Sequence, residues 1–341
     1  MNFVKRKTPF KLLAGVANIR ALFLFLGFLI FSQNTERQGR WRTIQRISGS
    51  FLNASAARYP SLMRRADPDL DLYRLKEATF VGHGSGTWNL HAYRKGVISG
   101  LEVFEKIYLV DSDGIRKMLW AYSSVAKHFA PSFKAPSLIC RLKGNWLVAC
   151  YFQFLPEVRP IDREQLVSAA IRFQECVDDF RWDGRSEAIY DFRRDAMYAQ
   201  GFTALGQIVR SHGYSESQLQ AIESWLLGPD VPCRFAHGDF TTKNVLRDGF
   251  VIDFDRSGYY PIGYDLGCLT GRFHDFDRLE KVKEFILMRF EPPGWKAYVS
   301  ILFFASIFAA KKKLRRNVSD YYLASLVAEV LQQLRKNGVF L

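Results

Sequence analysis

The sequence predicts an α+β protein in which a small strand-rich lobe precedes a larger helical lobe. Residues 76–155 contain short β-branched and aromatic segments interrupted by glycine, whereas apolar residues beyond Pro156 recur at helical spacing. Strands gathered in one part of a chain and helices in the next indicate an α+β layout. The 341 residues suffice for two such lobes, and an apolar content of 48% favours a folded chain.

Cysteine content and charge restrict the class of protein. The five cysteines are scattered and form no C-x-x-C pair, which argues against a disulfide framework or a structural zinc site and indicates a reducing compartment. The formal net charge of +14 favours anionic partners, namely phosphate-bearing substrates, acidic lipid surfaces or nucleic acid. No zinc-finger, RNA-recognition or helix-turn-helix pattern is present, so nucleic acid is the least favoured partner.

The N-terminal segment, residues 1–35, is basic and hydrophobic. Its apolar run over residues 12–31 has the length that a helix needs to cross a bilayer core of about 30 Å. Asn18 and Arg20 lie inside this run, and a central arginine costs about 2.5–3.5 kcal/mol on insertion. Three interpretations stay open: a helix on a membrane surface, which the pattern favours, a spanning anchor, or a helix docked on the protein.

Residues 36–75 are polar and rich in arginine, and they are interpreted as a connector. The strand-rich lobe then spans 76–155, with strands expected at 77–81, 87–94, 101–110, 137–142 and 146–154 and one helix at 115–129. The helical lobe spans 156–341, with helices expected near 166–180, 192–211, 216–227, 278–290, 296–314 and 319–336.

The segment from His237 to Asp255 carries the most specific chemical signal. It reads H-G-D-F-T-T-K-N, continues into a hairpin over 245–252 turned at Asp-Gly, and ends in D-F-D. Asp239 and Asn244, five residues apart on a tight loop, can direct a base and a metal ligand into one cleft, and the hairpin returns Asp253 towards them.

Phosphoryl transfer needs these groups. A nucleoside triphosphate carries magnesium, which requires hard oxygen ligands, and a carboxylate must orient the hydroxyl group of the acceptor. The set of Asp239, Asn244 and Asp253 supplies both kinds of group. It therefore predicts a phosphotransferase of the kinase type.

Together with the segment P-I-G-Y-D-L-G at 261–267, these motifs resemble the aminoglycoside phosphotransferase and choline kinase superfamily, which shares the protein-kinase-like fold. The resemblance is specific over the motifs and weaker from Lys76 to the C-terminus. It implies ATP and Mg²⁺ as cofactors. It also implies a role for each matching residue: Asp239 as catalytic base, Asn244 and Asp253 as magnesium ligands, His237 as structural support of the loop, and Asp265 as its anchor at a helix start.

The resemblance places the nucleotide site in the strand-rich lobe. Gly84 and Gly86, between two expected strands, would bring backbone N–H groups to the phosphates. Lys106 on the third expected strand is the candidate phosphate-binding lysine, with a solvated edge lysine as the alternative interpretation. Lys95, in a turn-like Arg-Lys-Gly, is the reserve candidate. The expected hinge at Gln153-Phe154-Leu155 would meet adenine through backbone groups of Gln153 and Leu155.

One departure from the family pattern concerns an acidic partner for the lysine. The pattern puts a glutamate on the helix after the third strand, but the expected helix 115–129 has none. Asp111, Asp113 and Glu77 are the alternatives. A nucleotide-binding pseudokinase at a membrane is therefore the second interpretation. A protein kinase is less favoured, because no lysine lies two residues beyond Asp239.

The acceptor is expected to be a hydroxyl group of a small molecule, a sugar or a lipid-linked head group. The apolar run at 12–31 and a basic cluster at 311–316 hint at an anionic membrane surface as a partner, although a solvated helix end is the favoured interpretation of the basic cluster. Because the catalytic lobe must meet ATP, the expected location is the cytoplasm, with residues 12–31 as the attachment to the cytoplasmic face of a membrane.

Overall fold

The computed structural model describes residues 67–82, 93–110, 113–126, 133–145, 147–155, 159–178, 192–194, 196–273, 294–312 and 318–339. The expected N-terminal helix at 12–31, the glycines Gly84 and Gly86, Asp111 and the expected helix at 278–290 lie outside these residues. The chain divides into two compact units, one within Met1–Tyr122 and Pro136–Glu157 and the other within Ser123–Ala135 and Val158–Leu341.

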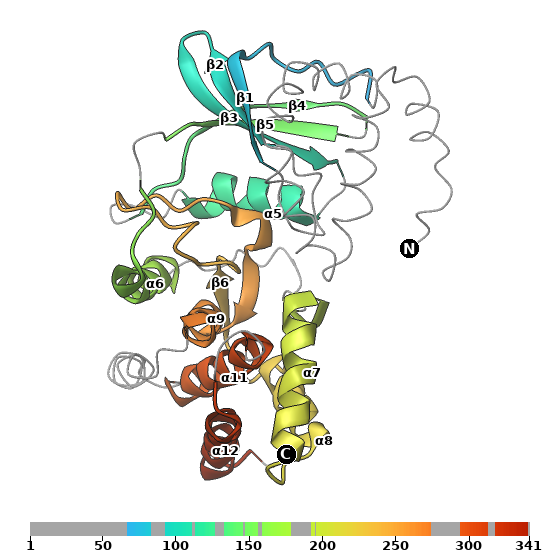
Figure 1. Cartoon of the computed structure of the whole chain (residues 1–341), viewed down its shortest axis with the longest axis vertical. Helices are drawn as coiled ribbons and strands as arrows, with labels where there is room; N and C mark the ends of the chain where they lie inside the picture. Colours follow the sequence, from blue (N-terminus) through green and yellow to red (C-terminus); the bar gives the residue numbers. More distant parts are fainter. Residues whose placement is uncertain are drawn as a thin grey trace. The chain divides into compact units, whose positions relative to one another are not determined.

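The first unit is built on a five-stranded antiparallel sheet with the strand order β1-β2-β3-β5-β4 (Figure 1). The strands are β1 (Lys76–Gly82), β2 (Tyr93–Ile98), β3 (Leu101–Leu109), β4 (Leu138–Lys143) and β5 (Leu147–Gln153). β3 is the central strand, and its register places Lys106 opposite Tyr93 on one side and Cys150 on the other. The strand-rich part of the expected α+β fold is therefore confirmed.

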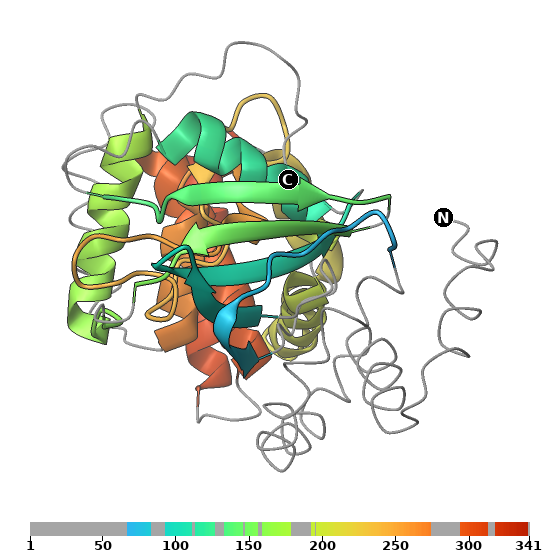
Figure 2. The same cartoon turned by 90° about the horizontal axis from the view of Figure 1, so that it is seen from above.

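Each face of this sheet carries its own apolar cluster. On one face, residues of β3 and β5 pack with Leu70 and Leu72, which precede β1; Figure 2 shows this preceding segment running across the strands. On the other face, Tyr108, Val148, Cys150 and Phe152 pack with helix α5 (Asp113–Trp120), which continues as a π-helical turn over Ala121–Val125. Asp67 holds the segment before β1 against the sheet, because its carboxylate accepts the N–H groups of Asn145 at 3.1 Å and Leu147 at 2.9 Å.

The expected turn around Lys95 is wrong. Arg94, Lys95 and Gly96 lie inside β2, and the chain reverses at Ser99 and Gly100, which both have positive φ angles. Gly96 has a packing role, since a Cβ atom there would lie 2.7 Å from Leu75 Cβ. Glycine inside a strand often marks such a close approach of another segment, which a sequence pattern does not distinguish from a turn.

The second unit is mainly helical, as expected. Its helices are α6 (Arg163–Asp178), α7 (Ala196–Arg210), α8 (Glu216–Leu226), α9 (Tyr264–Phe273), α11 (Gly294–Lys312) and α12 (Asp320–Lys336). Strands β6 (Cys233–Ala236) and β7 (Gly258–Pro261) form an antiparallel pair, and a 3₁₀ turn spans Phe254–Arg256.

Helix α11 forms the centre of the helical unit and packs against α7, α9 and α12 (Figure 1). Its residues from Ala297 to Ala310 are buried. The backbones approach closely at glycines: a Cβ atom at Gly271 of α9 would lie 2.4 Å from the carbonyl oxygen of Ala305, and one at Gly201 of α7 would lie 2.4 Å from that of Ile307. Helix α11 therefore fixes the position of α9.

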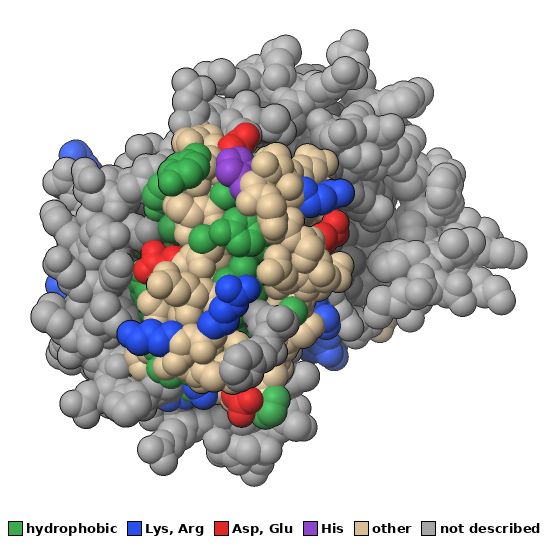
Figure 3. Space-filling view, turned by 90° about the horizontal axis from the view of Figure 1, so that it is seen from below, with side chains coloured by type: hydrophobic (Ala, Val, Ile, Leu, Met, Phe, Trp, Pro, Cys, Tyr) green, Lys and Arg blue, Asp and Glu red, His purple; other side chains and the backbone are tan. Residues whose placement is uncertain are grey.

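Within the described part of the chain, no helix has both the length and the apolar character needed to cross a membrane. On the face of the molecule seen in Figure 3, Lys and Arg side chains are scattered among acidic and apolar ones. The positive charge of the described residues therefore does not gather into one patch on this face.

Candidate active site

Strand β6 leads directly into the segment His237-Gly238-Asp239, so the sheet pair β6–β7 sets where this loop begins. Gly238 has a φ of +77°, and a Cβ atom there would lie 2.2 Å from the carbonyl oxygen of Arg256. Only glycine satisfies both restrictions. The glycine of the H-G-D motif thus lets the loop pass close to the backbone that follows Asp253.

His237 is fully buried and joins two parts of the loop. Its Nε2 lies 2.9 Å from the carbonyl oxygen of Ile252, and its Nδ1 lies 3.3 Å from the backbone nitrogen of Asp239. The neutral tautomer with hydrogen on Nε2 satisfies both partners, because Nε2 then donates and Nδ1 accepts. With both ring nitrogens engaged, His237 supports the loop structurally.

Asp265, in the first turn of α9, holds the backbone of the same loop. Its carboxylate accepts the N–H groups of His237 at 2.6 Å and of Gly238 at 2.9 Å. Burial raises the pKa of this carboxyl, while the hydrogen bonds from the two backbone N–H groups act in the opposite direction. The anchor is thus a buried carboxyl group that satisfies two buried backbone donors.

Asp239 and Asn244 lie in direct contact. The Asn244 Nδ2 group donates to the backbone oxygen of Asp239 at 2.9 Å and to its Oδ2 at 3.2 Å. Because these bonds use the nitrogen of the amide, its oxygen faces away from Asp239. The five-residue spacing therefore yields one carboxylate and one amide oxygen held by a common set of hydrogen bonds.

The hairpin returns Asp253 to this pair. The Ile252 N–H group donates to the backbone oxygen of Asn244 at 2.9 Å, and Val245 and Val251 form an antiparallel bridge. Asp253 itself has a φ of 69°, in the left-handed region that non-glycine residues rarely occupy. Such backbone strain gathers at functional sites, where surrounding structure enforces it.

Two arginines act on Asp239. Arg272, near the end of α9, places Nη1 at 2.7 Å from Asp239 Oδ1, with side chains 8% and 31% exposed respectively. Burial opposes ionisation of Asp239, but the charges of Arg272 and Arg256 outweigh it, so the pKa of Asp239 lies below its usual value. Asp239 is therefore a stable carboxylate whose two oxygens bond to Arg272 and Asn244.

The donor set of this site fits a magnesium ion. Magnesium takes oxygen ligands and commonly uses one or two protein groups together with phosphate oxygens and water. The amide oxygen of Asn244 and the carboxylate of Asp253 are groups of this kind, and the hairpin brings their backbones together.

The first unit carries the other expected site residues that the structure describes. Lys106 is buried on the central strand, with Nζ at 5.5 Å from the centroid of the Tyr108 ring, so it is no solvated edge lysine. Lys95 is exposed on β2, with Nζ at 5.3 Å from the Phe154 ring. Gln153 ends β5, and its N–H donates to the Ser137 carbonyl oxygen at 2.9 Å; Leu155 follows it, half-buried.

The register excludes one candidate partner of Lys106. Tyr93 pairs with both Lys106 and Gly82, at the end of β1, whereas Glu77 lies five residues earlier, about 16 Å away along the strand. The neighbouring Glu105 points to the opposite face, where it pairs with Arg94 at 2.5 Å.

Arg272 is the site residue that the sequence interpretation missed. Its signal was the spacing from Asp265, because residues seven apart lie on the same side of a helix about two turns apart.

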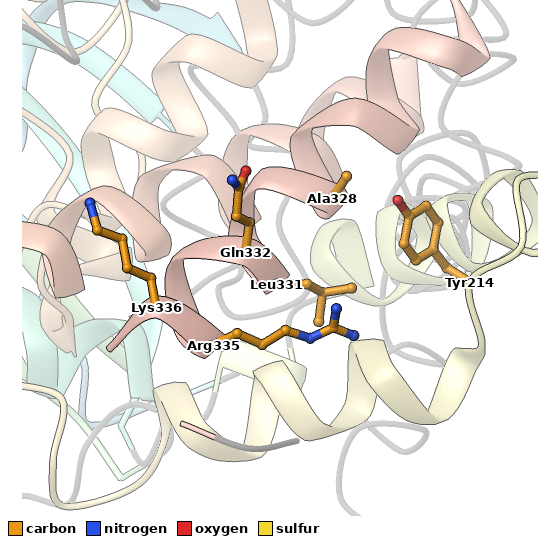
Figure 4. Close-up of a pocket in the computed structure, with 6 residues that line it drawn as sticks. All are labelled: Tyr214, Ala328, Leu331, Gln332, Arg335 and Lys336. Atoms are coloured by element: carbon orange, nitrogen blue, oxygen red, sulfur yellow. The ribbon is translucent and has the colours of Figure 1, made fainter. Parts of the chain in front are cut away.

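A pocket elsewhere in the unit, shown in Figure 4, includes no residue of His237–Asp255. It is lined by Tyr214 and by Ala328, Leu331, Gln332, Arg335 and Lys336 of α12.

Comparison with known families identifies the class of protein. Residues 121–298, just over half of the chain, match the model of the phosphotransferase enzyme family. The chain belongs to this family. The expected membership of a phosphotransferase family and the expected enzyme class are thereby confirmed. No curated protein sequence matches the chain.

Several solved structures are similar to this one. A microcompartment-associated aminopropanol kinase is 14% identical, with 82% of this chain and 99% of that chain covered and a TM-score of 0.48. A thermostable mutant of aminoglycoside phosphotransferase APH(4)-Ia, in a ternary complex with AMP-PNP and hygromycin B, is 12% identical. The match covers 84% of this chain and 100% of that chain, with a TM-score of 0.47. Choline kinase LicA from Streptococcus pneumoniae is 12% identical. The match covers 82% of this chain and 99% of that chain, with a TM-score of 0.42.

Proposed function

We propose that this phosphotransferase moves the γ-phosphoryl group of ATP to a hydroxyl group of a small molecule, a sugar or a lipid-linked head group. The observation that carries the proposal is the arrangement of Asp239, Asn244 and Asp253, in which Asn244 bonds to the Asp239 carboxylate and the hairpin returns the backbone before Asp253 to Asn244. Phosphoryl transfer depends mainly on positioning and charge neutralisation, and this set provides both.

Asp239 is the residue that receives the acceptor. An ionised carboxylate accepts a hydrogen bond from a hydroxyl group, and a lowered pKa makes it a weak acceptor of the proton itself. This suits a loose, metaphosphate-like transition state, in which the nucleophile needs orientation more than early deprotonation. Asp239 thus aligns the hydroxyl group with the phosphorus atom and takes its proton late.

Asn244 and Asp253 would hold Mg²⁺. When bound, this ion neutralises negative charge on the β- and γ-phosphates of ATP. The chain contributes rigid placement of the two ligands: Asn244 is fixed by its bonds to Asp239, and Asp253 by its left-handed backbone and the hairpin before it.

The nucleotide-binding part of the proposal involves the first unit. Lys106 would contact the phosphates, Gly84 and Gly86 would offer backbone N–H groups to them, and Gln153 and Leu155 would meet the adenine ring through backbone groups. Among these residues, Lys106 is the one whose side-chain position supports the proposed nucleotide site, because it is buried on the central strand.

An acceptor screen tests the function. Purified protein is incubated with γ-³²P-ATP and magnesium and with separate acceptors: choline, aminopropanol, hygromycin B, free sugars and a lipid-linked sugar. The proposal expects magnesium-dependent label in at least one acceptor and a rate of labelling lower by about 10²–10⁴-fold with Asp239→Asn. Equal labelling by both proteins would remove Asp239 from the mechanism, and binding of magnesium-ATP without transfer to any acceptor or to water would contradict kinase activity.

A further inference from the structure

Helix α9 contacts the proposed catalytic loop at two points. Asp265 binds the backbone N–H groups of His237 and Gly238, and Arg272 binds the side chain of Asp239. At 3.6 residues per turn, these two helix residues lie about 20° apart around the axis and about 10 Å apart along it. One side of a ten-residue helix therefore holds both the backbone and the side chain at the start of the loop.

The position of Arg272 is itself fixed by the core helix. Gly267 and Gly271 lie on another side of α9, where Cβ atoms would come within 2.7 Å of Phe304 Cβ and 2.4 Å of the Ala305 carbonyl oxygen respectively. The guanidinium carbon of Arg272 lies 5.6 Å from the centroid of the Phe308 ring, also on α11. Arg272 is thus held between a buried aromatic ring and the carboxylate of Asp239.

We propose that Arg272 is a positioning residue, which fixes the Asp239 carboxylate in the orientation that receives the acceptor hydroxyl. Arg272 binds Oδ1, while Asn244 Nδ2 binds Oδ2, so the two contacts together determine the rotation of the carboxylate plane. With Asn244 alone, the carboxylate would turn about one hydrogen bond. This role rests on the proposed function, because the orientation matters only if Asp239 receives an acceptor.

A planar guanidinium group suits this task. It presents its N–H groups in a fixed plane and stacks on aromatic rings, whereas a lysine ammonium group is a point charge on a flexible stem. A charge-conserving change, Arg272→Lys, is therefore expected to keep the ion pair and lose part of the orientation. The change Arg272→Gln removes the charge and keeps one amide donor.

The test compares Arg272→Lys, Arg272→Gln and a control, Arg335→Gln, which changes an exposed arginine of α12. The probe is magnesium-ATP with water as acceptor, and initial rates of label release at varied concentrations of magnesium-ATP give kcat and KM. A misplaced reacting group costs about 100-fold in rate, so Arg272→Gln should lower kcat by about that factor with KM for magnesium-ATP nearly unchanged. Arg272→Lys should lie between it and the wild type, and the control should match the wild type.

A double substitution separates positioning from direct contact with phosphate. If Arg272 acts through Asp239, then Arg272→Gln in the Asp239→Asn background causes no further loss of rate. A further loss of about 100-fold, as large as in the wild-type background, would overturn the proposal. A rise in KM with kcat unchanged would also overturn it.

A crystal structure of Arg272→Gln tests the proposal without any turnover. The expected result is a folded loop in which Asp265 keeps its two backbone bonds and the Asp239 carboxylate keeps its bond to Asn244 Nδ2, while the plane of the carboxylate has rotated about that bond. An unmoved carboxylate would overturn the positioning role even if the enzyme is active. Absence of wild-type turnover together with a rotated carboxylate would instead refute the proposed function and keep the structural role.

Discussion

The carboxylate of Asp265 accepts the backbone N–H of His237 at 2.6 Å, across 28 positions in the sequence. A second bond from Gly238, at 2.9 Å, joins the same carboxylate to the next residue of the loop. The first turn of α9 therefore defines the course of the backbone that presents Asp239. This relationship explains why D-L-G follows the H-G-D motif at a fixed place in the structure.

Replacing Asp265 with alanine is expected to destabilise the protein by about 2–4 kcal/mol. The reason is that two buried backbone N–H groups would lose their acceptor. Asp265→Asn, which keeps one acceptor oxygen, should cost less. Urea unfolding with equal m-values measures the difference, and an Asp265→Ala protein as stable as the wild type would show that these bonds do not hold the loop.

The contact between α9 and α11 gives a second prediction. Gly271→Ala is expected to cost about 1–3 kcal/mol, because its Cβ would lie 2.4 Å from the Ala305 carbonyl oxygen and backbone would have to move. The matched control is Gly206→Ala in α7, where the nearest atom would be 3.9 Å away. That change should instead stabilise the protein by about 0.5–1 kcal/mol. Thermal unfolding of both variants measures these effects. Equal shifts of the melting temperature in the two variants would contradict the proposed packing of α9 against α11.

The sheet of the first unit contains a buried ion pair. Arg94 and Glu105 are 1% and 0% exposed and 2.5 Å apart, so Glu105→Gln would remove the negative charge that pairs with this buried arginine. The expected loss is about 3–5 kcal/mol. Glu216→Gln, which breaks the exposed pair with Arg210, should cost about 0–1 kcal/mol. If chemical denaturation gave similar losses for both variants, burial would not be the deciding factor.

Lys106 and Lys95 are distinguished by their environment. Lys106→Met is expected to lower magnesium-ATP turnover by about 100-fold, because a preorganised cation on the central strand would be lost. Lys95→Met, at an exposed position of β2, should change the rate by less than about threefold. Steady-state kinetics compares the two. The reverse ranking would make Lys95 the phosphate-binding residue.

The site was predictable from the sequence where its geometry is local. Asp239 and Asn244 share a tight loop, and a hairpin of few residues delivers Asp253, so their spacing alone brings them together. Arg272 could not be assigned in this way. Its contact with Asp239 depends on the rotation of α9 about its axis, and packing of glycines against α11 sets that rotation.

The fold shows the same difference between features set by local sequence and features set by contacts between distant segments. The β5 strand is a nearly continuous apolar run, because both faces of the sheet are covered. Gly96 was misread because the close approach of Leu75, a residue distant along the chain, creates its need for glycine. Local pattern thus predicted the elements, whereas contacts between distant segments required the structure.

The central claim is that the loop carrying Asp239 transfers a phosphoryl group. The most direct measurement is the single-turnover rate of phosphoryl transfer from γ-³²P-ATP with magnesium by wild type and Asp239→Asn, after equal stability and equal nucleotide affinity have been established for both. The account predicts a rate lower by about 10²–10⁴-fold in Asp239→Asn. Equal rates in the two proteins would contradict it.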